Sequence, residues 1–146
     1  MSTLLEKIKQ LSAEITPETL VNRHHIHANP ELSYQEFQTQ AYVLEQLERM
    51  GIQAKKIANT GLIAEIKGKN PDSRVVALRA DMDALPIQET NEVPYKSQNP
   101  GVMHACGHDV HTASLLGTAQ ILQKVRDEFE GTIKLLFQPA EEKAPG

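Results

Sequence analysis

The sequence predicts an α/β sandwich with a mixed, largely parallel sheet. Three observations support this fold: helix-like apolar spacing up to about residue 50, short β-branched runs after it, and an apolar helix followed by one more strand. A strand, a crossover helix and a second strand make a right-handed parallel unit. Both strands of that unit should therefore end at the same edge of the sheet.

The N-terminal part predicts three helices. Apolar residues share one helical face over residues 3–12, and a Thr-Pro-Glu sequence before the next apolar stripe is typical of a helix start, which predicts a second helix over 17–27. Ser33 stands three residues before Glu36, the spacing of a capping box, and an apolar stripe continues from there to Gly51. We expect a third helix over this stretch.

Four strands and one further helix complete the prediction. The short runs at 52–57 and 62–66 are β-branched and bounded by glycines. Residues 74–78 are continuously apolar, which is typical of a strand covered on both faces. The helix at about 110–125 is apolar around most of its circumference, so it should lie against the sheet, and a last strand follows at 132–137.

Length and charge restrict the class of protein. The chain has 146 residues, enough for one ordinary domain, and its 15 Lys and Arg against 19 Asp and Glu give a net charge of -4 without a basic cluster. Nucleic acid is therefore an unexpected partner. No stretch approaches the roughly 20 apolar residues of a membrane span, so we expect no membrane partner and a cytoplasmic location. The single Cys106 is expected to be a reduced thiol.

Residues 104–111 hold the densest set of reactive side chains. This stretch contains the only cysteine, three of the six histidines and Asp109, directly before the apolar helix. Thiolate, imidazole and carboxylate groups this close together indicate a potential metal site. The alternative is structural, because a single cysteine is often a small buried hydrophobe and a histidine often caps or packs.

Paired carboxylates follow two of the predicted strands. Asp81 and Asp83 come after strand 74–78, and Glu141 and Glu142 come after strand 132–137. Parallel strands connected by the crossover helix would bring both pairs, and the start of that helix, to the carboxyl edge of the sheet, where ligands of open α/β sheets bind. The alternatives are that the aspartates cap a turn and that the glutamates are a solvated strand end.

This set of side chains could hydrolyse an amide. Adjacent carboxylates at a strand end point in different directions, so one of Glu141 and Glu142 can bind a metal while the other faces a water molecule. A divalent metal lowers the pKa of water toward about 7, and a neighbouring carboxylate can take the proton. The same carboxylate can then protonate the leaving amine.

Three motifs in register resemble a known enzyme family. Arg-Ala-Asp-Met-Asp-Ala-Leu-Pro at 79–86, Met-His-Ala-Cys-Gly-His-Asp at 103–109 and Phe-Gln-Pro-Ala-Glu-Glu at 137–142 resemble the metal-dependent amidohydrolases that include hippurate hydrolase, N-acyl-amino-acid deacylases, N-acetyldiaminopimelate deacetylase and auxin-conjugate hydrolases. Residues 23–32 fit the N-terminal helix region of the same family. The resemblance covers essentially the whole chain.

The resemblance implies a role for each residue of the edge. Cys106, His108 and Glu142 are implied metal ligands, with Cys106 shared between two metals, and Glu141 is the implied catalytic base. Asp83 matches an aspartate that lies behind a metal ligand and orients it for catalysis. The metal itself could be Zn, Mn, Co or Ni, because a mixed thiolate, imidazole and carboxylate set admits each of them.

Other polar residues near the motifs have less definite roles. Asp81 occupies the position of a ligand histidine in the peptidase branches of the superfamily, and its role here stays open. His104 and His111 are expected to support the site or pack the helix rather than bind metal. The three histidines within 24–27 are expected to be structural because they are far in sequence from the cluster. Arg79 is expected to pair with a local carboxylate.

The resemblance also implies a larger enzyme. Family members are longer, take two further histidine ligands from downstream of the Glu-Glu pair, and carry a lid domain used for dimerisation, so homo-oligomers are expected of the full-length relatives. Residues 1–146 would then be the N-terminal portion of the catalytic domain, a partial three-layer sandwich. We expect the downstream strands to be missing from the sheet, which leaves an uncovered edge and exposed apolar surface.

Three functional hypotheses follow. The first is a metal-dependent hydrolase of N-acyl amino acids or similar small-molecule amides, present in truncated and by itself inactive form. The second is a non-catalytic remnant that at most binds metal. The third, a cysteine nucleophile paired with His108, is weaker, because Cys106 lies only two residues away and such pairs usually draw their histidine from a distant segment.

Overall fold

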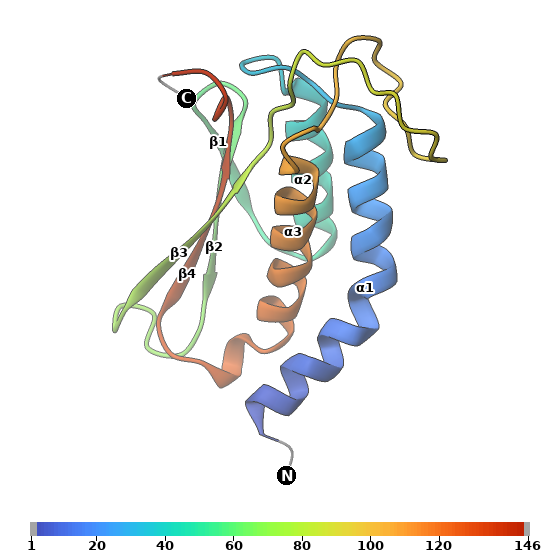
Figure 1. The fold of residues 1–146 in the computed structure, drawn as a ribbon. Coiled ribbons are helices and arrows are strands. Elements are labelled where there is room, and N and C mark those ends of the chain that lie inside the picture. The colour runs from blue at the N-terminus through green and yellow to red at the C-terminus, as the bar shows by residue number, and fades with distance from the viewer. Residues whose placement is uncertain (1–2, 145–146) are drawn as a thin grey trace.

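The computed structural model describes residues 3–144, in which a mixed sheet carries all three helices on one face (Figure 1). The elements in chain order are α1 (Leu4–Ala28), α2 (Phe37–Arg49), β1 (Ala54–Ile57), β2 (Gly61–Lys67), β3 (Val75–Asp81), α3 (His108–Lys124), a short 3-10 helix (Arg126–Glu128) and β4 (Thr132–Gln138). The described residues thus provide two layers of the predicted sandwich. The α/β class is confirmed.

The sheet is mixed, with the strand order β1-β2-β4-β3. β3 and β4 are parallel neighbours joined through α3, which confirms the predicted crossover unit. The pairs β1–β2 and β2–β4 are antiparallel, so the share of parallel pairing among the described strands is smaller than predicted. The reason is local, because β1 and β2 are joined by a tight turn in which Ala58 and Asn59 both have positive φ, and such a hairpin must be antiparallel.

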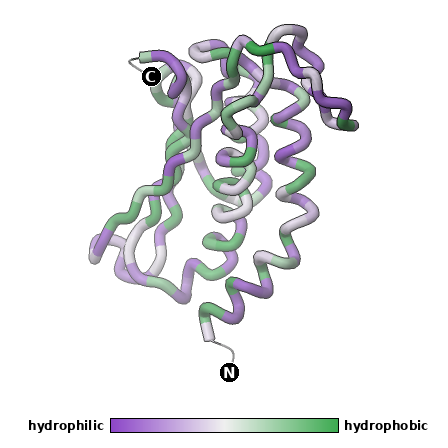
Figure 2. The backbone as a smooth tube through the Cα atoms, in the orientation of Figure 1, coloured by the Kyte–Doolittle hydropathy of each residue, from purple (hydrophilic) through white to green (hydrophobic). Residues whose placement is uncertain are grey.

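The core lies between the sheet and helices α2 and α3. Inward positions on β2 and β4 face one another in register, as in the pairs Leu62 with Phe137 and Ala64 with Leu135, and all four side chains are buried. Hydrophobic residues are interspersed with hydrophilic ones along the strands and the helices (Figure 2). The buried helix residues that complete this core are Val43, Leu47, Leu115, Leu116 and Ala119.

The first helix is continuous, so the prediction of two helices over 3–12 and 17–27 was wrong. Pro17 lies inside α1, and the Thr16 hydroxyl donates to the Ser12 carbonyl 2.8 Å away instead of starting a new helix. Close packing on α3 keeps the chain helical past the proline: a Cβ atom on Gly117 would lie only 2.8 Å from the Thr19 hydroxyl. No helix within residues 3–144 has the length and apolar character of a membrane span.

The strand β3 is an edge strand among the described residues. Its first residues are solvent-exposed, with Val75 at 59% and Val76 at 49% exposure, whereas Ala80 and Asp81 at its carboxyl end are buried. The expectation that this apolar run is covered on both faces was therefore wrong for the described chain. The reason is that the described helices cover only one face of the sheet, and β3 also has a strand neighbour on one side only.

Candidate metal centre

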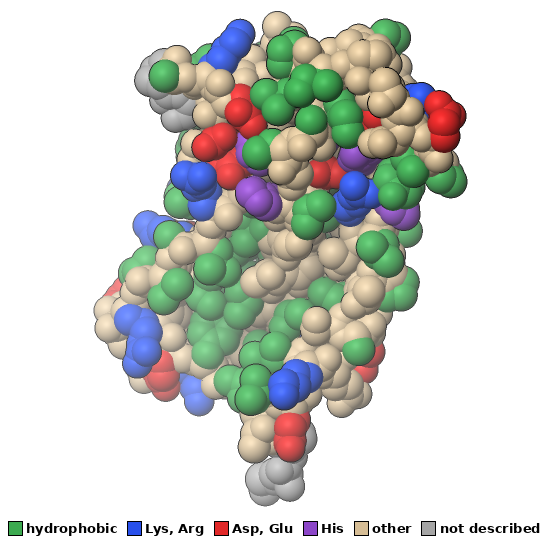
Figure 3. Space-filling model, viewed as in Figure 1, with side chains coloured by type: hydrophobic (Ala, Val, Ile, Leu, Met, Phe, Trp, Pro, Cys, Tyr) green, Lys and Arg blue, Asp and Glu red, His purple; other side chains and the backbone are tan. Residues whose placement is uncertain are grey.

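Three side chains with metal-ligand chemistry meet beyond the carboxyl ends of β3 and β4. One ligand atom each from Cys106, His108 and Glu142 lies within 4.8 Å of the others. Cys106 is in the turn before α3, His108 is the first residue of α3, and Glu142 follows β4. Gly107 between the first two has a φ of +108°, which an L side chain rarely adopts. Acidic and histidine side chains gather visibly around this end of the molecule (Figure 3).

The His108 imidazole is held in one orientation. Its Nδ1 lies 2.9 Å from the Asp83 carbonyl oxygen, and because a carbonyl only accepts, Nδ1 carries the proton. Its Nε2 lies 3.7 Å from a Glu141 oxygen and 3.9 Å from a Glu142 oxygen, beyond hydrogen-bond distance. The Nε2 lone pair is therefore available on the side where Cys106 and Glu142 lie. Metal-binding histidines are typically oriented in this way, by a hydrogen bond from the ring nitrogen that does not bind the metal.

Asp83 connects His108 to the turn that carries the two glutamates. Its carboxylate accepts hydrogen bonds from the Ser33 hydroxyl at 2.7 Å and from the Glu142 backbone N–H at 3.0 Å, and it lies 3.2 Å from His108 Nδ1. Burial alone would raise the pKa of Asp83, but the hydrogen bonds from Ser33 and from the N–H groups of Glu142 and Glu141 outweigh burial, and the pKa is lowered. Asp83 thus stays an ionised acceptor behind His108.

Ser33 and Glu36 do not form the predicted capping box. The helix begins at Phe37, and Ser33 is instead committed to Asp83. Glu36 is fully buried; its carboxylate accepts from the Thr60 hydroxyl at 2.6 Å and from the Ala140 backbone N–H at 2.8 Å. The buried polar groups of the site form hydrogen bonds with one another rather than with the helix end, because the N–H groups of the helix end can form hydrogen bonds with water.

Glu36 supports the turn that places the two candidate glutamates. Ala140 has a φ of +53°, an unusual conformation for alanine that the surrounding structure must stabilise. The hydrogen bond from its N–H to Glu36 anchors this residue directly before Glu141. The sequence offered no signal for this role, because the same spacing fits a helix cap.

Replacing Glu36 by Ala should destabilise the fold by about 2–4 kcal/mol, because it leaves two buried donors without acceptors. The matched control is Glu45→Ala in the helix that follows, α2, where the glutamate is exposed and pairs with Arg49, so a loss below about 0.5 kcal/mol is expected. Urea unfolding of the two variants measures both effects. Equal losses for the two variants would contradict the role assigned to Glu36.

The Cys106 thiol is exposed and surrounded by carboxylates. Its pKa is raised above the ordinary value, first because it donates a hydrogen bond to Glu142, then because of burial and the negative charge of Glu142, Glu141 and Asp81. A nucleophilic cysteine needs the opposite shift, so this setting disfavours the hypothesis of a Cys106–His108 nucleophilic pair. A divalent cation between these groups would favour the thiolate instead.

Asp81 forms part of a second group with ligand chemistry, together with His108 and His111. Its carboxylate lies 3.1 Å from Arg79 Nε and 3.3 Å from His111 Nδ1, so the expected pairing of Arg79 with a local carboxylate is confirmed. The Asp81 side chain is buried, whereas that of His111 is about half exposed. Because a guanidinium already neutralises Asp81, this group suits a cation less well than the first group does.

His104 is buried, and neither of its ring nitrogens has a hydrogen-bond partner among residues 3–144. It is a member of neither ligand group found among residues 3–144. Burial lowers its pKa to about 4, with Asp109 acting in the opposite direction and His27 and His108 adding to the decrease. The ring is therefore held neutral in the folded chain.

His104 should make the fold sensitive to acid. Its pKa falls from 6.5 to about 4 on folding, so the unfolded chain binds the extra proton and stability is lost as pH decreases from 6.5 toward 4. The full effect is about 3 kcal/mol. A His104→Leu variant should lack this component, so its unfolding midpoint should fall less between pH 7 and pH 4 than that of the parent. Parallel curves would contradict the assignment.

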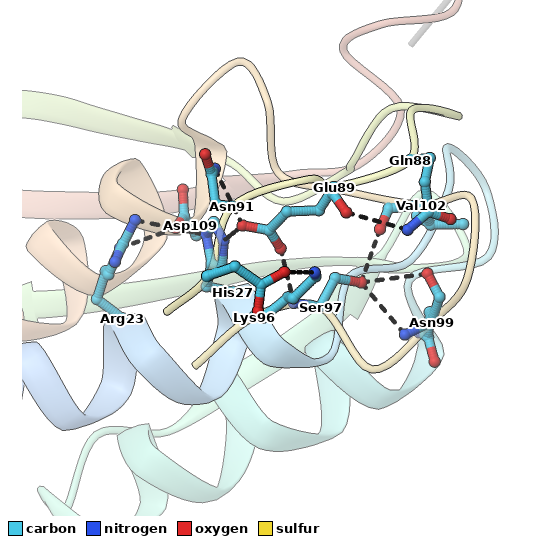
Figure 4. Close-up of polar contacts among 11 residues, drawn as sticks. Arg23, His27, Gln88, Glu89, Asn91, Lys96, Ser97, Asn99, Val102 and Asp109 are labelled. Carbon is cyan, nitrogen blue, oxygen red and sulfur yellow. Dashed lines mark hydrogen bonds and ion pairs between the residues drawn. The ribbon is translucent and has the colours of Figure 1, made fainter. Parts of the chain in front are cut away.

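A buried polar cluster that the sequence did not reveal lies behind the start of α3 (Figure 4). Arg23 and His27 from α1, Glu89 from the loop between β3 and α3, and Asp109 from α3 contact one another there. His27 was expected to be structural because it is far in sequence from the cysteine–histidine motif. In space it contacts the residue next to His108.

Sequence and structure comparisons show which known proteins these features resemble. The structure defines the class of protein: an α/β protein with a mixed sheet and a candidate metal centre. Thiolate, imidazole and carboxylate groups meet at the carboxyl edge of that sheet. Residues 77–146 match the model described as Peptidase family M20/M25/M40. This part of the chain is therefore similar to that family, which agrees with the resemblance inferred from the three motifs.

Individual relatives agree with this resemblance. The chain is 51% identical over 142 residues to the N-acyl-L-amino acid amidohydrolase of Geobacillus stearothermophilus. The alignment covers 97% of this chain and 38% of that relative. It is 46% identical to the N-acetyl-L-cysteine deacetylase of Bacillus subtilis, over 99% of this chain and 35% of the relative.

A solved structure gives the same result. The YXEP protein of Bacillus subtilis, described as a dinuclear metal binding peptidase from the M20 family, superposes with a TM-score of 0.83 at 45% identity, over 94% of this chain and 38% of the other. The chain thus spans about two-fifths or less of the length of these relatives.

Proposed function

We propose that this chain provides part of the active site of a metal-dependent hydrolase that cleaves the amide bond of N-acyl amino acids or similar small amides. The convergence of Cys106, His108 and Glu142 within 4.8 Å, with Glu141 beside them, carries the proposal. The names of the relatives support the substrate class: two of them are an N-acyl-L-amino acid amidohydrolase and an N-acetyl-L-cysteine deacetylase.

The three proposed ligands fit a divalent metal by their chemistry. Cys106 offers a thiolate, Glu142 a carboxylate, and His108 a nitrogen whose orientation is fixed by the Asp83 carbonyl. When bound, the metal supplies a Lewis acid that polarises the substrate carbonyl and makes water easier to deprotonate near neutral pH. Zn, Mn, Co and Ni all suit this ligand set. The dinuclear description of the B. subtilis relative supports two ions in the complete site.

Glu141 is the proposed general base. Its carboxylate lies 3.7 Å from His108 Nε2, and its side chain is 37% exposed, so it can reach both the proposed metal position and solvent. It would take a proton from the attacking water and pass it to the leaving amine. Asp83 is the proposed orienting residue, because it contacts both His108 and the backbone that carries the glutamates. Asp81, His104 and His111 would support the site rather than bind metal.

The proposed place of the chain in the enzyme is the N-terminal portion of the catalytic domain. The chain aligns with 38% of the G. stearothermophilus amidohydrolase over almost its own full length. Substrate selection, additional ligands and oligomer contacts would then lie outside residues 1–146. The uncovered β3 edge, where Val75 and Val76 are exposed, is a surface that further strands would cover.

Metal content and turnover of the purified chain together test the proposed function. Elemental analysis should find Zn, Mn, Co or Ni at about one ion per chain or more. A protein that contains the complete site should hydrolyse hippurate or an N-acetyl amino acid, and a chelator should abolish this activity. Stoichiometric metal without turnover would instead support the metal-binding remnant. A chain that binds none of these metals would contradict the proposed metal centre and leave only the non-catalytic remnant.

A further inference from the structure

His27 has an unusual set of hydrogen-bond partners for a buried imidazole. Its Nδ1 lies 2.7 Å from Asp109 Oδ2, and its Nε2 lies 3.1 Å from Glu89 Oε1. All three side chains are at least 95% buried. Both partners are carboxylate oxygens, which accept hydrogen bonds, so both ring nitrogens must donate. The geometry therefore describes His27 as an imidazolium that bridges two buried carboxylates.

Arg23 completes the charge balance of this cluster. Its Nε lies 2.9 Å from the same Asp109 oxygen that His27 contacts. Arg23 also approaches His27 Nδ1 to 3.4 Å, but a guanidinium can only donate and Nδ1 already donates over the shorter distance to Asp109. The cluster thus contains two cations and two anions. Buried charges persist in this way only when each is paired.

Glu89 joins the cluster to the loop between β3 and α3. Its other carboxylate oxygen accepts the Ser97 N–H at 2.7 Å, and Asn91 donates to Oε1 at 3.2 Å. Burial would raise the pKa of Glu89, but the hydrogen bonds from Ser97, His27 and Asn91 outweigh burial and lower it. Figure 4 shows these contacts meeting at Glu89, which lies against His27.

The same loop is held on α1 by an aromatic contact. Tyr95 stacks on His24 with ring centroids 3.9 Å apart and an interplanar angle of 8°. The Arg23 guanidinium lies 4.7 Å from the Tyr95 ring centroid. His27 therefore lies between a loop anchored to its own helix and the first turn of α3.

The cluster is adjacent to the proposed ligands. Asp109 directly follows His108, and the loop that contains Glu89 continues into Cys106. The amides of Val110 and His111 close the first turn of α3 on the Gly107 carbonyl at 3.0 and 3.2 Å. A displacement of Asp109 would move this turn and, with it, two of the three proposed ligands, Cys106 and His108.

We propose that His27 is a positioning residue for the metal centre: bridging Glu89 and Asp109, it fixes the segment from Cys106 to Asp109 on helix α1. This inference rests on the proposed function in so far as the segment holds a metal. The histidines of the first helix then have different roles. His27 orients the site, whereas His25 stacks on Tyr42 away from it.

The variant His27→Gln tests the proposal, with His25→Gln on the same helix as the matched control. Amide hydrogen exchange of the metal-free chain should become at least about tenfold faster at Val110 and His111 in His27→Gln, relative to core amides of β2 and β4. Zinc affinity should fall by about 10–100-fold. His25→Gln should leave both quantities within about twofold of the parent. Exchange that rises uniformly over the chain, or not at all, would overturn the positioning role.

Two further readouts separate the possible failures. Nitrogen-15 NMR of the parent chain should show a directly bonded proton on both ring nitrogens of His27; one ring nitrogen without a proton would overturn the proposal even if His27→Gln does not fold. If the parent chain binds no zinc but His27→Gln selectively loosens the first turn of α3, the proposed function fails while the positioning of the segment stands.

Discussion

Replacing Glu141 by Gln is expected to slow amide hydrolysis by a factor of about 10²–10⁴ while leaving the metal content unchanged. Glutamine keeps the size of the side chain but cannot accept the proton from water. Metal binding should persist because the three proposed ligands are Cys106, His108 and Glu142. The measurement is kcat for an N-acyl amino acid, with elemental analysis of the same sample. Both are made in a form of the protein that, without the substitution, hydrolyses the substrate and loses this activity on addition of a chelator.

The neighbouring glutamate provides the control for this prediction. Glu142→Gln has the same chemical change one residue away, but it should lose both metal and activity, because Glu142 lies with Cys106 and His108 whereas Glu141 is in neither ligand group. An undiminished rate for Glu141→Gln would remove it as the base. Loss of metal in both variants to the same extent would show that the two carboxylates share one role.

Loss of a proposed ligand should weaken metal binding by a factor of about 10²–10³. A complete set of four ligands in a structural zinc site is worth about 10–16 kcal/mol, so one ligand contributes roughly 3–4 kcal/mol. We expect this loss for His108→Ala and for Cys106→Ser, measured by competition with a chromogenic chelator. His108 belongs to both ligand groups, so its variant alone does not distinguish them.

Comparison with His111→Ala makes that distinction. His111 belongs only to the group that contains Asp81, where Arg79 already pairs with the carboxylate. Its replacement should change zinc affinity by less than about tenfold. A loss at His111 as large as that at Cys106 would move the metal to the Asp81 side of His108 and contradict the ligand set proposed here.

The convergence of the site could be predicted from the sequence because it follows from topology. β3 and β4 are parallel and are connected through α3. This connection places three segments at one edge of the sheet: the residues after β3, the residues after β4 and the start of α3. Cys106, His108 and Glu142 do meet there. No knowledge of the packing was required, because the chain connection alone imposes this arrangement.

The contacts that hold the site were not predictable, because they depend on packing between distant segments. Ser33 and Glu36 have the spacing of a capping box, yet both donate or accept within the buried site, since an unpaired buried carboxylate costs more than an uncapped helix end. His27 lies 82 residues from Asp109 in sequence and contacts it at 2.7 Å. Local patterns carry no information about such pairs.

Helix continuity shows the same limit. A proline usually ends a helix in local sequence terms, and Pro17 nevertheless lies inside α1, because the helix packs on α3 on both sides of it. In the same way, the apolar run of β3 predicted burial that only additional neighbours could provide. In both cases tertiary contacts, which a local pattern does not contain, decided the outcome.

The most direct test of the account is the absorption spectrum of the cobalt-substituted chain. A thiolate bound to cobalt(II) gives a strong charge-transfer band in the near ultraviolet, and cobalt accepts the same mixed ligand set as zinc. We expect this band on addition of stoichiometric cobalt to the parent chain, and its loss in Cys106→Ser. Cobalt bound tightly without a thiolate band, or a spectrum unchanged by Cys106→Ser, would contradict a metal centre built on Cys106, His108 and Glu142.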